Sequence, residues 1–393
     1  MDPTGAPGAH YRRPDVNEAA DSPEGVRIDA FEVVRVVMPL AAPFATITST
    51  QTERALLLLR ALGPDAEGWG ECVAMSAPLY SHEYVDGAEE VITRYLIPRL
   101  WGSTRLRAAE VAPALAAIKG HPMAKAALEM AVLDAELRRD GIGLAAALGG
   151  IRSLVEAGVA VGILGSLTEL VDAVGAHVDE GYRRVKIKIG PGRDLEPVRV
   201  LREAFPELGL QVDANGSYRL ADAAHLARLD PFGLLLIEQP LADDDLVGHA
   251  ELARRLQTPV CLDESIVSYA ATAAAIEIGA CDVVNIKAGR VGGLLEARHI
   301  HDLCVERGIP VWCGGMLETG IGRAANVCLA SLPGFTLPGD LSASARYFAQ
   351  DLTEPFVLEH GCLRVPDGPG IGVEVLTHVV DRYTVSRRTV RRL

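Results

Sequence analysis

Short apolar runs recur along the second half of the chain, and each is followed by a polar turn and a stretch with helical spacing. The runs span residues 159–164, 184–190, 208–215, 234–240, 259–265, 281–289, 310–316 and 335–340. They are nearly all apolar rather than alternating, which is typical of parallel strands buried on both faces. Any single run is also compatible with a buried helix, but each is short and bounded by Gly, Pro or Asp. The pattern therefore predicts an α/β fold with a TIM-like (β/α) barrel over residues 155–355, whose last strand is the weakest.

Residues 26–150 follow a different pattern, which predicts a separate α+β domain. Strand-like segments span residues 26–40, 55–62 and 68–73, and helical spacing covers 82–100, 106–118 and 123–139. The second and third strands form a hairpin bent at Gly63-Pro64-Asp65, and Gly141 ends the last helix. We expect two short strands within residues 356–378 to pack back on this domain and complete it.

The two ends of the chain lack such patterns. Residues 1–25 are rich in Pro, Gly, Ala and Asp, which leaves too little apolar area to offset the entropy of ordering. They are expected to form a disordered tail. Residues 379–393 end in a basic stretch, which we interpret as a solvated terminus rather than a nucleic-acid contact.

Composition and charge limit the partners and the compartment. The net charge of -14 and the pI near 5.2 argue against nucleic acid or an anionic membrane as the main partner. The seven cysteines are scattered singly, so neither a disulfide framework nor a zinc knuckle is indicated, and a reducing cytoplasm fits. No segment reaches the roughly 18 apolar residues of a membrane span. We expect a cytoplasmic protein.

The strongest signal is a regular spacing of charged residues within the apolar runs. Lys188, Asp213, Glu238, Asp263 and Lys287 are separated by 25, 25, 25 and 24 positions. Because this spacing equals one βα unit, each residue falls at the C-terminal end of its own strand, where barrel active sites are built. The sequence therefore predicts that five charged groups converge on one mouth of the barrel.

Taken singly, each of these residues has an ordinary structural explanation. Asp213 and Asp263 are suited to helix capping, Glu238 to a loop end, and Lys188 to an exposed strand edge. Taken together, they form a cluster that is costly to desolvate without a cation. Three carboxylates suit a hard cation such as Mg²⁺, and the lack of His at these strand ends disfavours zinc. Asp213, Glu238 and Asp263 are therefore the predicted metal ligands, with Asn215 and Glu264 as accessory groups.

The two lysines of this series predict the chemistry. Lys188 and Lys287 would face each other across the mouth, one on each side of a bound carboxylate substrate. A cation on that carboxylate accepts the charge that develops when the neighbouring proton is removed. We expect the cation and the other lysines to lower the pKa of the base. Lys186 would contact either the substrate or a carboxylate ligand.

Four further residues are weaker candidates for substrate binding or for support of the lysines. Gly315 and Met316 end the seventh run and Glu318 follows it; glycine there allows close backbone approach to a ligand or merely tight packing. Arg290 and Glu318 would tune the lysines or form ordinary surface ion pairs. The polar loop 46–51 of the first domain is suited to close over the mouth.

The motifs around these residues resemble a known superfamily. The stretches KIK (186–188), DAN (213–215), IEQP (237–240), LDES (262–265) and NIKAGR (285–290) resemble the enolase superfamily, muconate-lactonizing subgroup. Residues 311–344 and the stretch GPGIGV (368–373) resemble most closely the N-succinylamino acid racemase / o-succinylbenzoate synthase family. The similarity extends from about Ile28 to Val373.

The resemblance implies a fold, a cofactor and two reactions. The α+β domain would cap a (β/α)7β barrel and supply specificity loops near residues 44–51 and 78–83. The reactions are dehydration of a cyclohexadiene carboxylate to o-succinylbenzoate, for menaquinone synthesis, and racemisation of N-acylated amino acids. Both begin with removal of an α-proton and depend on Mg²⁺, for which Mn²⁺ or Co²⁺ can substitute. Members of the family are homo-oligomers, which implies an octamer or a dimer here.

The resemblance also implies residue roles. The lysine that matches Lys188 is the base for dehydration, and the one that matches Lys287 stabilises the intermediate by a cation–π contact. In racemisation the two exchange a proton across the substrate plane. Arg290 resembles an arginine of racemase-capable members, which favours retained racemase activity.

Two departures and two alternatives remain open. The family usually has proline where this chain has Ala288, and Thr-Ala where it has Gly216-Ser217, which puts the relative racemase rate in doubt. Another subgroup enzyme, a dipeptide epimerase or a cycloisomerase, would keep the same charged residues. Epimerases usually carry an acidic DxD-like motif where this chain has Asp340-Leu341-Ser342, which disfavours that alternative. A non-catalytic metal- or carboxylate-binding protein is the second alternative. Sequence leaves the physiological reaction and the preferred acyl group and side chain open.

Overall fold

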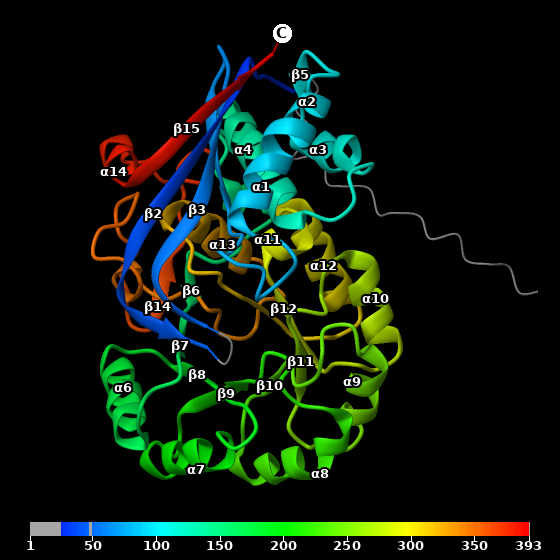
Figure 1. Cartoon of the computed structure of the whole chain (residues 1–393), viewed down its shortest axis with the longest axis vertical. Coiled ribbons are helices and arrows are strands. Elements are labelled where there is room, and N and C mark those ends of the chain that lie inside the picture. The colour runs from blue at the N-terminus through cyan, green and yellow to red at the C-terminus, as the bar shows by residue number, and fades with distance from the viewer. Residues whose placement is uncertain (1–24, 47–48, 393) are drawn as a thin grey trace, which may run out of the picture.

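The computed structural model describes residues 25–46 and 49–392, which form a barrel and a cap (Figure 1). The predicted N-terminal tail lies outside the described residues, except for Gly25. In Figure 1 the barrel forms the lower part and the cap the upper part, and the strands β2 and β3 reach down from the cap to the barrel. The α/β class, the TIM-like barrel and the capping domain predicted from the sequence are confirmed.

The barrel is a curved sheet of seven parallel strands. They are β7 (Gly158–Val161), β8 (Arg184–Lys188), β9 (Gly209–Asp213), β10 (Ile237–Glu238), β11 (Val260–Leu262), β12 (Val283–Ile286) and β13 (Val311–Cys313), and they neighbour one another in chain order. The strands are almost entirely buried, as the apolar runs predicted. The five evenly spaced charged residues therefore lie at the edge of a continuous apolar sheet.

The eighth predicted strand is not a regular strand. Residues 335–340 make only two isolated bridges, Phe335 with Val311 and Gly339 with Ala157. These bridges still connect the β13 edge of the sheet to the segment that leads into β7. Pro338 lacks a backbone N–H and Gly339 weakens a strand, so this segment closes the barrel without forming a ladder.

Helices cover the outside of the sheet and set the loops at its C-terminal edge. They are α6 (Leu167–Asp179), α7 (Leu195–Ala204), α8 (Ala223–Leu226), α9 (Leu246–Ala253), α10 (Tyr269–Glu277), α11 (Ala288–Val291), α12 (Leu294–Glu306) and α13 (Gly320–Ala330), with the 3₁₀ segments η3 (Leu220–Asp222), η4 (Ala227–Phe232) and η5 (Ser344–Arg346). Several begin at a side-chain cap: Ser166, Asp245, Ser268 and Thr319 each accept a backbone N–H of the first turn. These caps fix where each strand-to-helix loop ends.

The cap is a four-stranded antiparallel sheet packed on helices. Its strands are β2 (Ala30–Ala45), β3 (Thr50–Leu62), β4 (Glu67–Cys72) and β15 (Thr384–Arg391), and its helical segments are α1 (Val85–Val91), the π-helical η2 (Ile92–Leu96), α2 (Ile97–Leu100), α3 (Ala108–Leu115), α4 (Pro122–Asp140) and α5 (Leu144–Leu148). An added Cβ at Gly68 or Gly70 would collide with the backbone of α4. Glycine is therefore required where β4 and α4 meet.

The C-terminal residues do not form the solvated tail that the sequence predicted. After α14 (Thr377–Tyr383), residues 384–391 form β15, which pairs antiparallel with β2 from Thr384–Val36 to Arg391–Ala30. The strand is exposed along most of its length, so it lacks the apolar alternation by which strands are recognised. Its arginines are typical of an exposed sheet edge.

Only one of the two strands expected within residues 356–378 forms. It is β14 (Cys362–Arg364), which pairs with β6 (Leu154–Glu156) at the end of the segment that joins the cap to the barrel. The glycine-rich stretch after it forms turns, and Gly370 bridges Gly143 in the cap. The remaining short pair, β1 (Val26–Arg27) with β5 (Arg105–Leu106), lies within the cap.

Buried carboxylates of the cap hold the N-termini of two barrel helices. Glu71, at the end of β4, accepts hydrogen bonds from the N–H of Thr319 (3.1 Å) and Gly322 (3.0 Å) and from the Thr319 hydroxyl (2.6 Å) at the start of α13. Glu129 of α4 accepts the N–H of Leu295 (3.1 Å) at the start of α12. These contacts fix the cap over the mouth of the barrel.

Glu129 predicts a pH dependence of stability. Burial raises its pKa to about 8, against a model-peptide value of about 4.5. The folded state therefore binds more protons between these values, so the contribution of Glu129 is fully present below pH 4.5 and is lost as the pH rises through 8. We expect Glu129→Gln to make the fall in the free energy of unfolding between pH 5 and pH 8 shallower, by up to about 1.4 kcal/mol per pH unit.

Urea unfolding at several pH values measures this slope. Glu196→Gln, at an exposed position of α7, is the control and should keep the slope of the unmodified protein. An unchanged slope in Glu129→Gln would contradict the interpretation.

Candidate active site

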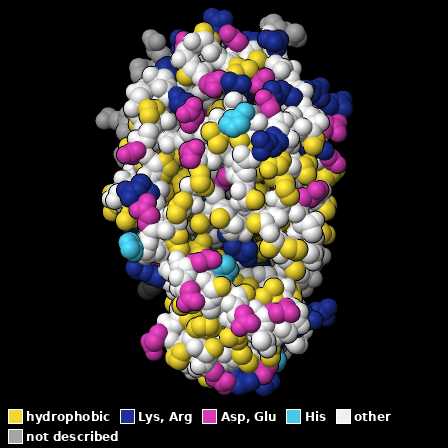
Figure 2. All heavy atoms as spheres, turned by 90° about the vertical axis from the view of Figure 1, so that its left-hand side faces the viewer, with side chains coloured by type: hydrophobic (Ala, Val, Ile, Leu, Met, Phe, Trp, Pro, Cys, Tyr) yellow, Lys and Arg dark blue, Asp and Glu magenta, His cyan; other side chains and the backbone are white. Residues whose placement is uncertain are grey.

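A cavity of about 590 Å³ lies between the barrel mouth and the cap. Its walls come from the β2–β3 hairpin, the loop after β4, and the ends of the barrel strands. On the face shown in Figure 2, the surface is hollowed between the upper and lower parts of the molecule, and Lys or Arg side chains lie at the edge of the hollow. Nine of the twelve predicted site residues line the cavity: Lys186, Lys188, Asp213, Asn215, Glu264, Lys287, Gly315, Met316 and Glu318.

The remaining three predicted residues lie just behind the cavity wall. Glu238, Asp263 and Arg290 have 0%, 1% and 3% of their surface exposed. Each contacts a residue that does line the cavity, so all twelve belong to one cluster. The predicted convergence of these residues is therefore present in the structure.

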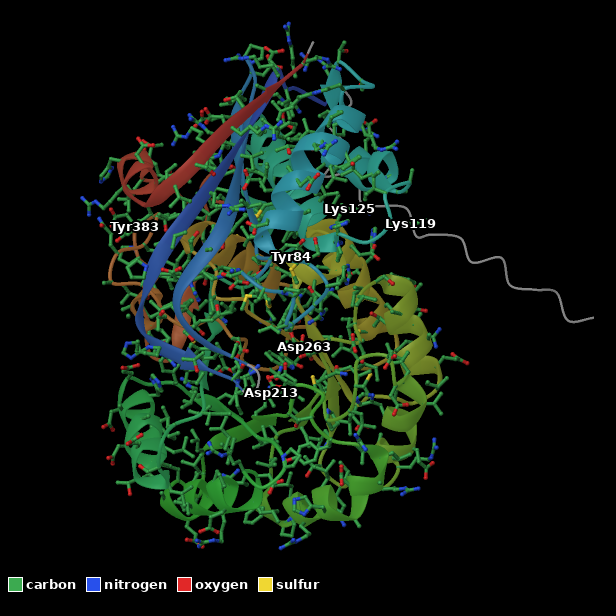
Figure 3. The ribbon with its side chains drawn as sticks, in the orientation of Figure 1. Tyr84, Lys119, Lys125, Asp213, Asp263 and Tyr383 are labelled. Carbon is green, nitrogen blue, oxygen red and sulfur yellow. The ribbon has the colours of Figure 1, made fainter. Side chains whose placement is uncertain are left out.

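Lysines concentrate at this site. The chain has only five lysines among 38 basic residues, and Lys186, Lys188 and Lys287 all line the cavity. Figure 3 shows Asp213 and Asp263 at the junction of barrel and cap, whereas Lys119 and Lys125 lie on the cap. The other 33 basic residues are arginines, whose guanidinium keeps its proton. The cavity therefore contains three amines, which can lose a proton and act as bases more readily than guanidinium groups can.

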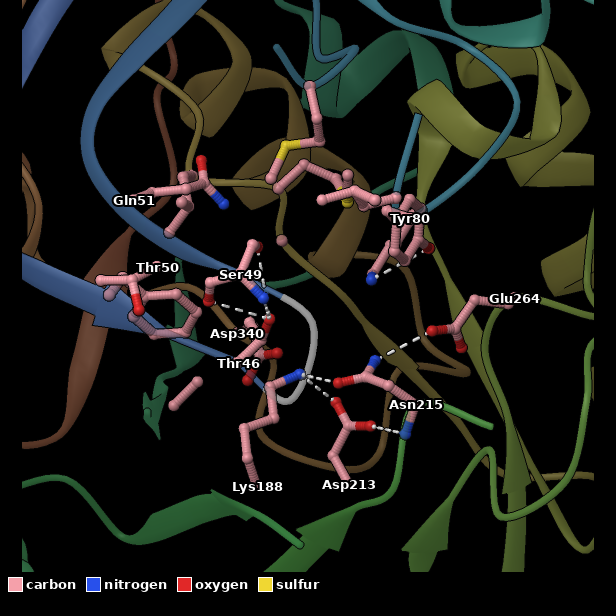
Figure 4. Close-up of a pocket in the computed structure, with 18 of the residues that line it drawn as sticks. Thr46, Ser49, Thr50, Gln51, Tyr80, Lys188, Asp213, Asn215, Glu264 and Asp340 are labelled. Atoms are coloured by element: carbon pink, nitrogen blue, oxygen red, sulfur yellow. Dashed lines mark hydrogen bonds and ion pairs between the residues drawn. The ribbon is translucent and has the colours of Figure 1, made fainter. Parts of the chain in front are cut away.

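Lys188 ends β8 and bonds two neighbouring polar side chains. Its ammonium donates to Asp213 Oδ2 (2.6 Å) and to Asn215 Oδ1 (2.7 Å) (Figure 4). The strand register places Lys188 beside Asp213 and Asp213 beside Glu238. Burial opposes the ionisation of Asp213, but the charges of Lys188 and Lys186 outweigh it and hold the pKa of this carboxyl below its usual value.

Lys287 follows β12, with three strands between it and Lys188. Its ammonium lies 2.8 Å from Asp263 Oδ2 and 3.1 Å from the Tyr80 hydroxyl, and 4.6 Å from the centroid of the Tyr80 ring. Burial lowers the pKa of Lys287, but Tyr80, Glu238 and Glu264 outweigh burial and raise it above the usual range. The lowered pKa expected from the sequence is therefore not produced by the protein groups alone.

Arg290 anchors the same side of the site. Its Nη1 pairs with Asp263 Oδ1 and lies 3.2 Å from the Tyr80 hydroxyl. Its other nitrogens donate to the backbone carbonyls of Ile266 (2.7 Å) and Asn285 (2.6 Å). Arg290 therefore fixes Asp263 and Tyr80 rather than forming a surface ion pair.

Glu238 lies at the floor of the site and is fully hydrogen-bonded. Lys186 Nζ (2.8 Å) and Gln211 Nε2 (3.1 Å) donate to its Oε2, and Asn285 Nδ2 (2.8 Å) donates to Oε1. Burial lowers the pKa of Lys186, but Asp340, Glu238 and Asp213 outweigh it and raise this pKa. Of the two roles open to Lys186, the structure favours contact with a carboxylate ligand.

The acidic residues fit a hard cation in their chemistry. Glu264 accepts from Asn215 Nδ2 (2.9 Å) with one oxygen, and its Oε2 is buried without a hydrogen-bond partner among the described residues. Burial and the negative charges of Asp213 and Glu238 raise the pKa of Glu264 to about 7. Unused carboxylate oxygen inside a group of acids, with no sulfur or imidazole ligand, suits a cation that prefers oxygen.

The same acids are not arranged as a metal cluster as they stand. Within residues 25–46 and 49–392, no three acidic, His or Cys side chains are grouped to hold an ion. Asp213 and Asp263 each bond a lysine ammonium instead. A cation would therefore compete with these amines for the carboxylate oxygens, and its binding would release them.

Cap segments complete the walls of the cavity. Phe44, Thr46 and residues 49–53 of the hairpin line it, as do Met75 and Tyr80 of the loop after β4. The hairpin is held on the barrel by the Ile163 N–H, which donates to Ala45 O (2.9 Å), and by the Ala41 N–H, which donates to Tyr347 O (2.8 Å). The expected specificity loops thus border the cavity, although of residues 78–83 only Leu79 and Tyr80 do so.

The sequence interpretation missed Tyr80 and Asp340 as site residues. Tyr80 comes from the cap, far from the barrel motifs in sequence, and no spacing rule predicted it. Asp340 follows Gly315 by 25 positions, so the same spacing that located the other residues would have found it. Gln211 and Asn285, which donate to Glu238, precede Asp213 and Lys287 by two positions. Side chains two positions apart on a strand point to the same face, so this spacing could have indicated them.

Comparison with known proteins identifies the class to which this fold and site belong. Residues 28–149 match the mandelate racemase / muconate lactonizing enzyme N-terminal domain, and residues 169–379 match the enolase C-terminal domain-like family. The chain belongs to the enolase superfamily, whose enzymes generally use a divalent metal ion. The resemblance found in the sequence is confirmed.

Three members of this superfamily are similar to nearly the whole chain. An N-succinylamino acid racemase from Amycolatopsis sp. is 61% identical over 92% of this chain and 99% of that protein. An o-succinylbenzoate synthase from Geobacillus kaustophilus is 48% identical over 88% of this chain and 93% of that protein. A crystal structure of an enolase superfamily member from Listeria innocua has a TM-score of 0.89 and 37% identity, covering 93% of this chain and 99% of the other.

No helix in the described part of the chain is both long and apolar enough to cross a membrane.

Proposed function

We propose that this protein removes the α-proton of a carboxylate substrate with the help of Mg²⁺, and that it acts as an o-succinylbenzoate synthase and an N-succinylamino acid racemase. The observation that carries the proposal is the pair of lysines, Lys188 and Lys287, which line one cavity from the ends of β8 and β12, with three strands between them. Relatives with both activities match nearly the whole chain. Mn²⁺ or Co²⁺ is expected to substitute for Mg²⁺.

Each residue of the site has a part in the proposed reaction. Asp213, Glu238 and Asp263 would hold the cation, which when bound draws the developing negative charge of the substrate carboxylate. Lys188 removes the proton in dehydration, while Lys287 faces the other side of the reacting carbon. In racemisation one lysine removes a proton and the other returns one. Lys186 keeps its charge beside Glu238, since two carboxylates hold its ammonium.

A direct assay decides between this function and the alternatives. With Mg²⁺ present, we expect turnover of the cyclohexadiene carboxylate and of N-succinylamino acids, and kcat/KM for muconate or for a dipeptide at least about 100-fold lower. The reverse order would assign the protein to another activity of the subgroup. Folded protein that binds Mg²⁺ and turns over none of these substrates would support the non-catalytic alternative.

The Tyr80 hydroxyl provides a second test within the site. It lies 3.1 Å from Asp263 Oδ1, 3.1 Å from Lys287 Nζ and 3.2 Å from Arg290 Nη1. A hydrogen bond to a charged group contributes about 1.5–3 kcal/mol, so Tyr80→Phe is expected to lower kcat/KM about 10-fold or more. Tyr84→Phe, exposed on the same loop and outside the cavity, is the control. Equal activity of the two variants would exclude a role for this hydroxyl.

We also propose a cytoplasmic homo-oligomer, an octamer or a dimer. The seven cysteines are free and six of them are buried, which suits a reducing compartment. Light scattering on the purified protein measures the number of subunits, and a monomer at micromolar concentration would contradict the proposal.

A further inference from the structure

Asp340 is a charged residue of the cavity to which the proposed reaction gives no part. It lies at the end of the irregular segment that closes the barrel, and its side chain is 8% exposed. In Figure 4 it lies on the side of the cavity near Thr46, away from Glu264. Each of its two oxygens bonds a different cation: Oδ1 the Arg184 Nη1 (2.6 Å) and Oδ2 the Lys186 Nζ (2.6 Å).

Arg184 holds Asp340 and the segment before it in place. It starts β8, two positions before Lys186, and only 1% of its side chain is exposed. Its Nε (3.2 Å) and Nη2 (2.7 Å) both donate to Pro338 O, in the same segment as Asp340. A Cβ at Gly158 would overlap the guanidinium, so glycine in β7 makes room for it.

Trp312 forms the surface on which this group packs. The Arg184 guanidinium lies 5.2 Å and the Lys186 ammonium 4.8 Å from its ring centroid. Trp312 is fully buried and its indole N–H points to Cys261 Sγ at 3.3 Å, so the ring has a fixed orientation. The two cations and Asp340 therefore form one packed, ordered unit under the cavity.

This unit determines which carboxylates Lys186 contacts. The ammonium bonds Asp340 and Glu238 but stays 3.5 Å from Asp213 Oδ2. Asp213 is left to Lys188, at 2.6 Å. A lysine has a long, flexible side chain, so without Asp340 the ammonium would move from its present position toward Asp213, a predicted metal ligand.

We propose that Asp340 and Arg184 are positioning residues that hold Lys186 away from the predicted cation-binding oxygens of Asp213. This inference rests on the proposed function, because it assigns those oxygens to a divalent cation. Loss of the pair would let Lys186 compete with the cation, which weakens cation binding and lowers turnover. Neither residue need touch the substrate.

The test uses the double variant Arg184→Gln/Asp340→Asn. Removing both members leaves Lys186 paired with Glu238 and keeps the net charge, so a change in Mg²⁺ binding is not an effect of the overall charge of the protein. We expect the dissociation constant for Mg²⁺, measured by calorimetry without substrate, to rise about 10-fold, and kcat to fall with a smaller change in KM. Arg364→Gln/Glu359→Gln, which removes an exposed ion pair, is the control and should leave both unchanged.

Two outcomes would overturn the inference. One is a folded double variant with the Mg²⁺ affinity and kcat of the unmodified protein. The other, which needs no variant and applies even if the double variant does not fold, is a Mg²⁺-bound crystal structure in which Lys186 has left Asp340. Calorimetry measures Mg²⁺ binding independently of turnover. If the protein turns over none of the proposed substrates, the proposed function is contradicted. The calorimetric comparison still decides the role of Asp340.

Discussion

Lys188→Ala is expected to abolish both the dehydration and the racemisation activity while the protein still folds and binds Mg²⁺. Lys188 is the base on its side of the cavity, and a positioned acid–base group contributes about 10²- to 10⁴-fold to the rate. Its removal also frees Asp213 from an ion pair of 2.6 Å, so cation binding should not weaken. The measurement is kcat for each substrate at saturating Mg²⁺, with calorimetry for the metal.

Lys287→Ala is expected to have the same effect from the opposite wall of the cavity. Lys119→Ala provides the control, because Lys119 is an exposed lysine of the cap and lies far from the site in Figure 3. Near-normal rates in either site variant would defeat the assignment of the two lysines. A general loss of folding in both would be seen by circular dichroism and would redirect the test to Lys188→Gln and Lys287→Gln.

Removal of the divalent cation is expected to have the second large effect. Treatment with EDTA should abolish turnover, and Mg²⁺ should restore it, with Mn²⁺ or Co²⁺ effective in its place. Without a cation, Asp213 and Asp263 hold the ammonium groups of Lys188 and Lys287, and neither amine is available as a base. The cation both stabilises the developing charge and releases the lysines.

Substitution of the three predicted carboxylate ligands tests whether the effect of EDTA comes from loss of a cation at this site. Asp213→Asn, Glu238→Gln and Asp263→Asn should each weaken Mg²⁺ binding and lower kcat by at least about 100-fold. Asp244→Asn, in the nearby loop after β10 but outside the cavity lining, should change neither. Full activity in EDTA would contradict the proposed mechanism.

The barrel and most of its site could be predicted because both follow from one repeat. Lys188, Asp213 and Glu238 end strands β8, β9 and β10, and Asp263 and Lys287 directly follow β11 and β12. Parallel strands place equivalent positions at one edge, so equal spacing in sequence becomes proximity in space. The register pairs Lys188 with Asp213 and Asp213 with Glu238, as this reasoning requires.

The parts that could not be predicted depend on contacts distant in sequence or on exposed backbone. Tyr80 reaches Asp263 across 183 positions, and nothing in its local sequence indicates that contact. Strand β15 has no buried face, so its residues carry no apolar alternation. The segment that contains Asp340 is held by two bridges and side-chain contacts rather than a ladder, which made it the weakest strand in the pattern.

The ionisation of the lysines could not be predicted from the sequence either. A bound cation and the other lysines were predicted to lower the pKa of the base, but the structure places acids beside each amine. For Lys287, the effects of Tyr80, Glu238 and Glu264 together outweigh burial and raise the pKa of the ammonium. A bound cation would oppose these negative groups, which ties the basicity of the site to its metal.

Exchange of the substrate α-proton in deuterated water tests most directly whether the two lysines flank one carbon. Each enantiomer of an N-succinylamino acid is incubated with Mg²⁺ and the Lys188→Ala or Lys287→Ala variant, and the loss of the α-proton signal is followed by NMR. We predict that neither variant inverts its substrate, and that each exchanges only one enantiomer, the opposite one in the two variants. Exchange of the same enantiomer by both variants, or of both enantiomers by either, would contradict the placement of Lys188 and Lys287 on opposite faces.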